Sequence, residues 1–259
     1  MDLGLTNQKV LITGGSKGIG LACARIFLAE GAQVALVSRS QQNLDAARKE
    51  LGNKVYTIPA DLTDAAAAAA MVDRVEKEFG ALDVLVNSAG AAKRTDADDL
   101  TPAAWRAGMD AKYFSYINVI DPVIKRMGKR GRGAIINVIG SGGKVASPTH
   151  LAGGAANAAL LLATAGLAYA YASKGVRVVG VSPGVTKTER VAQGLRAEAK
   201  RANVSEDQAY KQMIARLPMG RPAEPDEIAD IVVFAASERG RYLTGANIST
   251  DGAASHVVI

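Results

Sequence analysis

The sequence predicts an α/β fold, a doubly wound parallel sheet of seven strands with helices on both faces. Apolar, strand-like runs alternate with helical segments along all 259 residues, which is typical of sheets built from strand–helix–strand units. Most runs are rich in Val, Ile and Leu without polar alternation, as expected for strands that are buried on both faces. The first run ends in a glycine-rich stretch, Thr13–Gly20, and such a turn commonly joins a strand to a helix in these sheets.

The order of the elements follows from the same pattern. Strands are expected at 9–13, 33–38, 54–59, 82–87, 133–139, 176–182 and 246–250. Helices are expected at 18–30, 41–51, 64–79, 101–128, 151–173 and 225–237. Asp64 is a favourable N-cap for the alanine-rich helix that follows it, and Gly31, Gly80 and Gly175 each stand where a left-handed residue can end a helix. Right-handed crossovers between these strands give a doubly wound sheet, in which ligands bind at the carboxyl ends of the strands.

One stretch does not belong to this alternation. Residues 185–222 are polar and helical, and they lie between the end of a strand and the last helix. Loops at this edge of a sheet often carry function, so this stretch is the predicted lid over a substrate. No linker or internal repeat divides the chain, and residues 1–259 are expected to form a single domain.

The composition argues against several kinds of partner. The formal net charge is +6, but Lys and Arg are scattered apart from 125–132 and have no aromatic platform, so nucleic-acid binding is not expected. The stretch 151–172 comes closest to a membrane span, but its Ala and Gly residues favour a tightly packed helix and no membrane partner. Cys23 is the only cysteine and is expected in the core. Without a disulfide or a basic leader, the chain fits the cytoplasm, and no metal site is predicted.

The glycine-rich stretch has the features of a phosphate-binding turn. Its glycines permit the turn, the close approach of a phosphate and the packing of helix on strand. The N–H groups at the start of the helix face the negative charge of a pyrophosphate, and the serine and lysine of the turn can contact it. The predicted phosphate-binding set is Gly14, Ser16, Lys17, Gly18, Ile19 and Gly20.

Six short motifs, in order along nearly the whole chain, resemble those of the short-chain dehydrogenase/reductase family. They are Thr13–Gly20, Asp61-Leu62, Asn87–Gly90, Ser182–Gly184, Gly220–Ala229 and Leu243–Gly252. The resemblance implies a Rossmann-like fold and an oxidoreductase that acts on a small carbonyl or alcohol with a nicotinamide cofactor. It also implies a homotetramer or homodimer built on the long helices, with the apolar C-terminus 257–259 either buried by a neighbouring subunit or frayed.

The resemblance implies that strand-end loops form the cofactor site. In this reading the Asp61 carboxylate accepts a hydrogen bond from the adenine amino group, and Leu62 follows it in the same loop. The loop of Asn87, Ala89 and Gly90 lies over the cofactor. The residues after the sixth strand, of which the last three hold the nicotinamide carboxamide, are Pro183, Gly184, Val185, Thr186 and Thr188.

The end of the second strand favours NADP(H) over NAD(H). A NAD-selective site usually has Asp or Glu there, which binds the ribose hydroxyls, whereas this strand ends in Ser38 and Arg39. The Arg39 guanidinium can stack on adenine and pair with a 2′-phosphate, and Lys17 can reach the same phosphate. The alternative is that both are solvated surface cations.

The catalytic positions depart from the family pattern, which uses Asn, Ser, Tyr and Lys, the last two spaced as Tyr-x-x-x-Lys. Counting from the flanking motifs puts the Tyr position at Gly153 and the Lys position at Asn157. The Asn position falls at Lys112, and the Ser position at Gly140 or Ser141. Because glycine cannot donate a proton, the family's usual mechanism is in doubt.

One hypothesis is that the site is rearranged and not lost. Lys112 then supplies the ammonium from the Asn position, while Asn157 hydrogen-bonds a ribose hydroxyl. His150 becomes the proton donor, because its ordinary pKa suits transfer near neutral pH, and Ser141 binds the substrate oxygen. Tyr113 is a second candidate donor. The alternatives are that Lys112 points to solvent and that His150 is a loop residue without a role.

Three functions are therefore compatible with the sequence. The first is an NADP(H)-dependent oxidoreductase with a rearranged site, which the exchange of Lys112 and Asn157 favours. The second is a dinucleotide-binding protein without catalysis, a sensor or part of an assembly, which a lost proton donor would favour. The third is a lyase or isomerase derived from the same fold, since fold alone does not decide chemistry.

Overall fold

A seven-stranded parallel sheet forms the centre of the computed structural model, which describes residues 1–90 and 92–257 apart from the side chains of Arg190 and Ala197. The strands are β1 Lys9–Thr13, β2 Gln33–Ser38, β3 Val55–Pro59, β4 Val84–Asn87, β5 Gly133–Val138, β6 Val176–Pro183 and β7 Asn247–Thr250. They lie in the order β3-β2-β1-β4-β5-β6-β7, and every pairing is parallel. The predicted Rossmann-like, doubly wound fold is confirmed, and the strand order reverses between β1 and β4.

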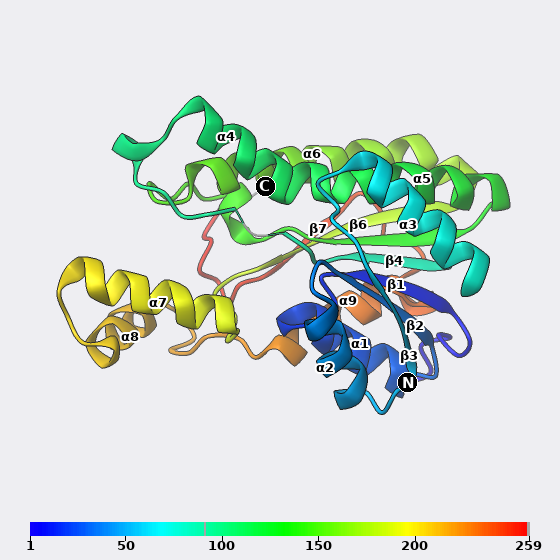
Figure 1. Cartoon of the computed structure of the whole chain (residues 1–259), viewed down its shortest axis with the longest axis horizontal. Coiled ribbons are helices and arrows are strands. Elements are labelled where there is room, and N and C mark those ends of the chain that lie inside the picture. The colour runs from blue at the N-terminus through cyan, green and yellow to red at the C-terminus, as the bar shows by residue number, and fades with distance from the viewer. Residues whose placement is uncertain (91, 258–259) are drawn as a thin grey trace.

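Helices cover both faces of the sheet (Figure 1). One face carries α1 Gly18–Ala29, α2 Gln41–Glu50 and α9 Pro225–Ala236, and the other carries α3 Ala65–Glu78, α5 Ser115–Arg130 and α6 Leu151–Tyr171. Each face has its own apolar core, the first around Cys23 and the second around Tyr116. Cys23 is fully buried, as expected, and desolvation raises the pKa of its thiol.

The helix that was expected over 101–128 is divided by a change in its winding. It begins as α4 Pro102–Met109, continues through a π-helical turn, η2 Asp110–Phe114, and becomes α5. Thr101 caps the start of α4 by accepting a hydrogen bond from the Ala104 amide. Short π-helical segments within α-helices occur frequently at functional sites, and this one contains Lys112.

The predicted lid forms two helices, α7 Glu189–Ala202 and α8 Glu206–Ala215, which stand apart from the layered body of the molecule (Figure 1). Ion pairs connect α7 to the rest of the chain: Lys17 contacts Glu189 at 2.9 Å, and Arg201 contacts Asp96 at 2.9 Å. The role of this segment as a lid remains a prediction, as does the single-domain organisation. Residues 258–259, part of the apolar C-terminus, lie outside the described chain.

The stretch expected to be a packed helix is α6, extended by the short turn η4 Ala172–Lys174. By length and composition it is apolar enough to cross a membrane. In the fold, however, α6 packs against β6, α4 and the short turn η3 Ser141–Gly143. A partly buried core helix of a soluble protein passes the same test of length and composition.

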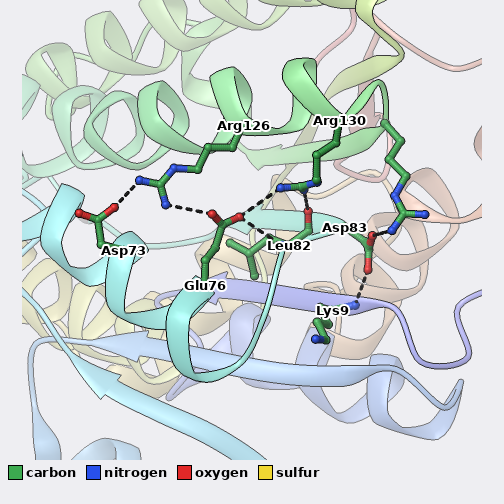
Figure 2. Close-up of polar contacts among 8 residues, drawn as sticks. Lys9, Asp73, Glu76, Leu82, Asp83, Arg126 and Arg130 are labelled. Carbon is green, nitrogen blue, oxygen red and sulfur yellow. Dashed lines mark hydrogen bonds and ion pairs between the residues drawn. The ribbon is translucent and has the colours of Figure 1, made fainter.

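The amino-terminal edge of the sheet is secured by a network of charged groups (Figure 2). The Glu76 carboxylate on α3 forms ion pairs with the guanidinium groups of Arg126 at 2.9 Å and Arg130 at 3.3 Å, both from α5. The remaining contacts join Arg126 to Asp73, Arg130 to the Leu82 carbonyl, and Asp83 to both the Lys9 amide and Arg132. The network therefore connects α3, α5 and the starts of β1 and β4.

Candidate functional site

The glycine turn after β1 is as tightly packed as a phosphate-binding turn must be. Gly14 is left-handed, with φ +65°, and a Cβ there would lie 2.7 Å from the Ala89 Cα. A Cβ on Gly20 would lie 2.4 Å from the Gly14 carbonyl oxygen. Helix α1 begins at Gly18, so its first N–H groups are left for a ligand. Ser16 is buried within this turn.

A cleft of about 260 Å³ opens beside this turn, at the carboxyl ends of β1 to β4. It brings together many of the cofactor residues expected from sequence: Gly14, Ser38, Arg39, Asp61, Leu62, Ala89 and Gly90. The Asp61 carboxylate accepts hydrogen bonds from the Thr63 amide at 3.0 Å and hydroxyl at 2.8 Å. These bonds, with a smaller contribution from the charge of Arg39, lower the pKa of Asp61.

The turn after β6 lies against the glycine turn. A Cβ on Gly18 would lie 3.2 Å from the Thr188 Cγ2, and Lys17 is held by Glu189, the next residue. Thr186 is buried, and its hydroxyl donates to the Gly184 carbonyl at 3.3 Å. The expected cofactor segment Pro183–Thr188, whose residues Val185, Thr186 and Thr188 are the predicted carboxamide contacts, thus adjoins the phosphate-binding turn.

A chain of buried polar side chains runs beneath the site, across β1, β4, β5 and α6. The Thr13 hydroxyl donates to Asn87 at 3.3 Å, Asn87 to Asn137 at 3.0 Å, and Asn137 to the Thr164 hydroxyl at 3.0 Å. The Thr13 oxygen also accepts from the amides of residues 88 and 89, which fixes the loop after β4. Sequence reasoning found Asn87 but missed Asn137 and Thr164; the available signal was an asparagine near the carboxyl end of each of two expected strands.

The imidazole of His150 occupies the space directly beside Gly153. A Cβ on Gly153 would lie 2.1 Å from the ring Cε1 and 2.5 Å from Nε2. The ring and any side chain at position 153 therefore exclude each other. The edge of the ring that carries Cδ2 and Nε2 faces Gly142, whose Cβ would lie 3.3 Å from Cδ2. His150 is the residue that precedes the first turn of α6.

Asn157 lies one turn further along α6, on the same side of the site. It is only 6% exposed, and its Oδ1 is buried without a hydrogen-bond partner in the described structure. Its Nδ2 lies 3.3 Å from where a Cβ on Gly140 would stand, and 3.6 Å from that of Gly142. A buried amide oxygen without a donor is costly, so this atom is well suited to receive a ligand hydroxyl.

Lys112 points into the protein, and the alternative that it points to solvent is wrong. Its ammonium donates to the Tyr116 hydroxyl at 2.6 Å and to the Val138 carbonyl at 2.8 Å. Tyr116 is fully buried and donates to the same carbonyl at 2.7 Å. Because Val138 ends β5 and Asn157 lies beside Gly140, the two exchanged residues approach the same strand end.

The other two candidates are placed less centrally. Ser141 begins η3 and is partly buried beside Gly142. Tyr113 packs its ring edge-on against Phe114, with ring centroids 5.1 Å apart. Within the described residues, no group of three His, Cys, Asp or Glu side chains is positioned to hold a metal ion.

A parallel sheet with a glycine turn and a cleft at its switch point is a characteristic setting for a dinucleotide. Residues 14–254 match the short-chain dehydrogenase family model described as enoyl-(acyl carrier protein) reductase. The chain belongs to the short-chain dehydrogenase/reductase family.

Known relatives cover nearly the whole chain. It is 32% identical to a 3alpha-hydroxysteroid dehydrogenase of Mediterraneibacter gnavus, over 98% of this chain and 99% of the relative. The chain is also 36% identical to an acetoacetyl-CoA reductase of Shinella zoogloeoides, over 95% of this chain and 98% of that relative. Its fold matches L-sorbose reductase of Gluconobacter frateurii, solved with NADPH and L-sorbose, with a TM-score of 0.93, 27% identity and full coverage of both chains.

Proposed function

We propose that the protein is an NADP(H)-dependent oxidoreductase that interconverts a small carbonyl compound and its alcohol, with His150 in place of the family's tyrosine. The observation that carries this proposal is the imidazole beside Gly153. The position that resembles the family's tyrosine has no side chain, and a group able to transfer protons near neutral pH fills the adjoining space.

The residues at the carboxyl edge fit a dinucleotide. The cradle around Gly14 has no room for a Cβ, and the buried Oδ1 of Asn157 has no donor in the described structure. The phosphates are held by the turn Gly14–Gly20, adenine by Asp61, and the 2′-phosphate by Arg39 with Lys17. The carboxamide is held by the segment Val185–Thr188. When bound, the cofactor supplies or accepts the hydride.

The chain's own side chains manage the proton and the orientation of the substrate. In the reductive direction, protonated His150 donates its proton to the carbonyl oxygen as that oxygen becomes a hydroxyl, and neutral imidazole remains. In the oxidative direction, neutral His150 takes the proton back. Ser141 hydrogen-bonds the substrate oxygen, and Asn157 accepts a hydrogen bond from a ribose hydroxyl. Lys112 provides a fixed positive charge at the end of β5.

The relatives and neighbours support a carbonyl or alcohol substrate. The curated relatives include a steroid dehydrogenase and an acetoacetyl-CoA reductase, and the L-sorbose reductase was solved with NADPH. The second strand of this chain ends in Ser38 and Arg39 without an acidic residue, which supports NADP(H) over NAD(H).

The test combines binding and turnover. Fluorescence titration should give tighter binding of NADPH than of NADH, and Arg39→Ala should weaken NADPH binding about tenfold or more with little effect on NADH. Oxidation of NADPH should then be followed with a panel of ketones, aldehydes and quinones. His150→Gln should lower kcat by about 100-fold or more, because a positioned acid contributes 10²–10⁴. Equal NADPH binding by Arg39→Ala and the wild type would refute the cofactor assignment.

The same test separates the remaining functions. Tight NADPH binding without turnover of any carbonyl would favour a cofactor sensor. Consumption of a substrate without a change in NADPH absorbance would favour a lyase or isomerase. Turnover that His150→Gln leaves unchanged would overturn the assignment of the proton donor.

The proposal includes a homodimer or homotetramer in the cytoplasm. It is supported by large apolar side chains on the outer face of α6, where Leu162 is 78% and Tyr169 is 92% exposed. A second copy of the chain would cover these side chains. Analytical ultracentrifugation should give two or four chains, and a monomer would refute this part.

A further inference from the structure

Gly153 lies in α6 at a position where glycine does not stabilise the helix. Gly153 lies in the first turn of α6, and glycine is less favourable than alanine inside a helix. A Cβ at this position would collide with the His150 ring at 2.1 Å. On the same helix, a Cβ on Gly166 would meet nothing within 4 Å. The absence of a side chain at 153 is therefore a requirement of the imidazole and not of the helix.

The residue at position 157 matters because a charge on it would change the pKa of the His150 ring. A phenol, with an ordinary pKa of about 10, must be acidified by a neighbouring cation before it can transfer protons near neutral pH. An imidazole, with an ordinary pKa of about 6.5, needs no such help. A cation beside the protonated ring would instead lower its pKa and remove the donor at working pH.

Asn157 is close enough to the ring for this effect. Both groups flank Gly142, whose Cβ would lie 3.3 Å from the His150 Cδ2 and 3.6 Å from the Asn157 Nδ2. The ammonium of Lys112, at the strand end that Asn157 also approaches, is bound by the Tyr116 hydroxyl and the carbonyl that ends β5. The other titratable groups on segments packed against His150 or the start of α6 are Arg94, Arg106, Asp110, Tyr113 and Lys144.

We infer that Gly153 and Asn157 are paired adaptations to an imidazole proton donor: Gly153 makes room for the ring, and Asn157 keeps a positive charge away from it. The residues at 150, 153 and 157 then depend on one another. A lysine at 157 would lower the pKa of the histidine and so disable it as a donor, and any side chain at 153 would displace its ring. The inference rests on the proposed role of His150, and it assigns Asn157 an electrostatic role beyond its hydrogen bond to the cofactor.

The test is a proton NMR titration of the resting protein, which needs no turnover. The chain has only two histidines, His150 and His256, and the His150→Gln variant assigns their ring signals. Asn157→Lys should lower the pKa of His150 by about one unit, and the nearly isosteric Asn157→Asp should raise it by a similar amount. Ala70→Lys adds the same charge on an exposed position of α3, away from the helix that carries Asn157, and should leave the titration unchanged.

The outcomes distinguish this inference from the proposed function. If both Asn157 variants titrate like the wild type, or shift in the same direction, the electrostatic role is wrong. If they shift in opposite directions, the role holds even where no carbonyl is turned over, and then only the proposed function fails. Where there is turnover, the pH at which the reduction rate falls should move with the NMR pKa in each variant. Asn157→Asp suffices if Asn157→Lys does not fold.

Discussion

The two edges of the sheet differ in how their polar side chains are paired, although the buried Nε of Arg130 at the amino edge also has no partner in the described structure. At the amino edge the carboxylates of Glu76 and Asp83 each accept from more than one donor (Figure 2). Arg177 donates to the backbone carbonyls of Ala235, Ala236, Ser237 and Leu243. At the carboxyl edge the buried Oδ1 of Asn157 has no donor in the described structure, and the glycine turn leaves helix N–H groups open.

This difference separates stability from binding. Polar groups that are satisfied within the chain contribute to folding, whereas groups left for a ligand cost stability until the ligand arrives. Substitutions at the amino edge should therefore change unfolding and leave catalysis intact. Substitutions of the groups that are left for a ligand at the carboxyl edge should do the reverse.

The largest effect is expected for Gly153→Ala. The new methyl group displaces the His150 ring, so kcat should fall by about 100-fold or more. The ring can swing away toward solvent, so the fold and NADPH binding should be retained. Steady-state kinetics and a thermal melt measure both properties. Gly166→Ala is the matched control and should leave kcat unchanged. Full activity in Gly153→Ala would show that the ring position is not needed.

The next effect is expected at the amino edge. Glu76 is 16% exposed at its side chain and binds two arginines of α5. Glu76→Ala should lower the free energy of unfolding by about 2 kcal/mol, because it leaves these arginines without their shared partner. Urea denaturation measures this loss, and kcat/KM should not change. The exposed pair of Asp207 and Lys211 provides a control, since Asp207→Ala should cost about 0.5 kcal/mol or less. Equal losses in the two variants would contradict the contrast.

A comparison of two buried asparagines sharpens the contrast. Asn137 is bonded on both sides of its amide, whereas the Oδ1 of Asn157 has no partner. Asn137→Leu should cost about 2 kcal/mol or more of unfolding free energy, while Asn157→Leu should change it by about 0.5 kcal/mol or less. Asn157→Leu should, however, weaken NADPH binding about tenfold, as titration would reveal. Unchanged affinity would mean that this oxygen does not receive the cofactor.

The smallest effect is expected at Thr63. Its amide and hydroxyl hold the pKa of Asp61 below its usual range, and Thr63→Val removes only the hydroxyl, so that pKa should rise part of the way toward the ordinary value of about 3.9. A carboxyl whose pKa is lowered on folding stabilises the protein above its unfolded pKa, and this contribution is lost as the pH falls through the folded value. The stability difference between variant and wild type should therefore be present at pH 7 and shrink below about pH 4. Carbon-13 NMR of the carboxyl and urea denaturation at both pH values measure it, and a constant difference would refute the assignment.

The sheet could be predicted because strands buried on both faces leave an unambiguous apolar signal. The helix ends were also readable: Asp64 caps α3, and Gly31, Gly80 and Gly175 adopt the left-handed conformation that was expected of them. The winding change at 110–114 could not be predicted, because no residue type marks a π-helical turn in the way that Gly or Pro marks the end of a helix.

The candidate catalytic region could be predicted only in part. Counting from flanking motifs located Gly153 and Asn157, but the contact between the His150 ring and Gly153 depends on the path of the loop that precedes α6. That path is set by tertiary contacts, such as the hydrogen bond of the Thr95 amide to the Thr149 carbonyl. Asn137 was overlooked because a single amide in an apolar strand gives no periodic signal.

The π-helical turn η2 makes this part of the gene sensitive to its length. A deletion of one codon within 110–114 would let α4 run into α5 as an uninterrupted α-helix. Each residue removed rotates α4 around the helix axis by about 100° relative to α5. The close approach of Gly108 to Ala152, where a Cβ would lie 2.8 Å from the alanine methyl, would then be lost while the core face of α5 stayed in place. A change in the number of residues here would therefore break the packing of α4 on α6 even where every side chain is kept.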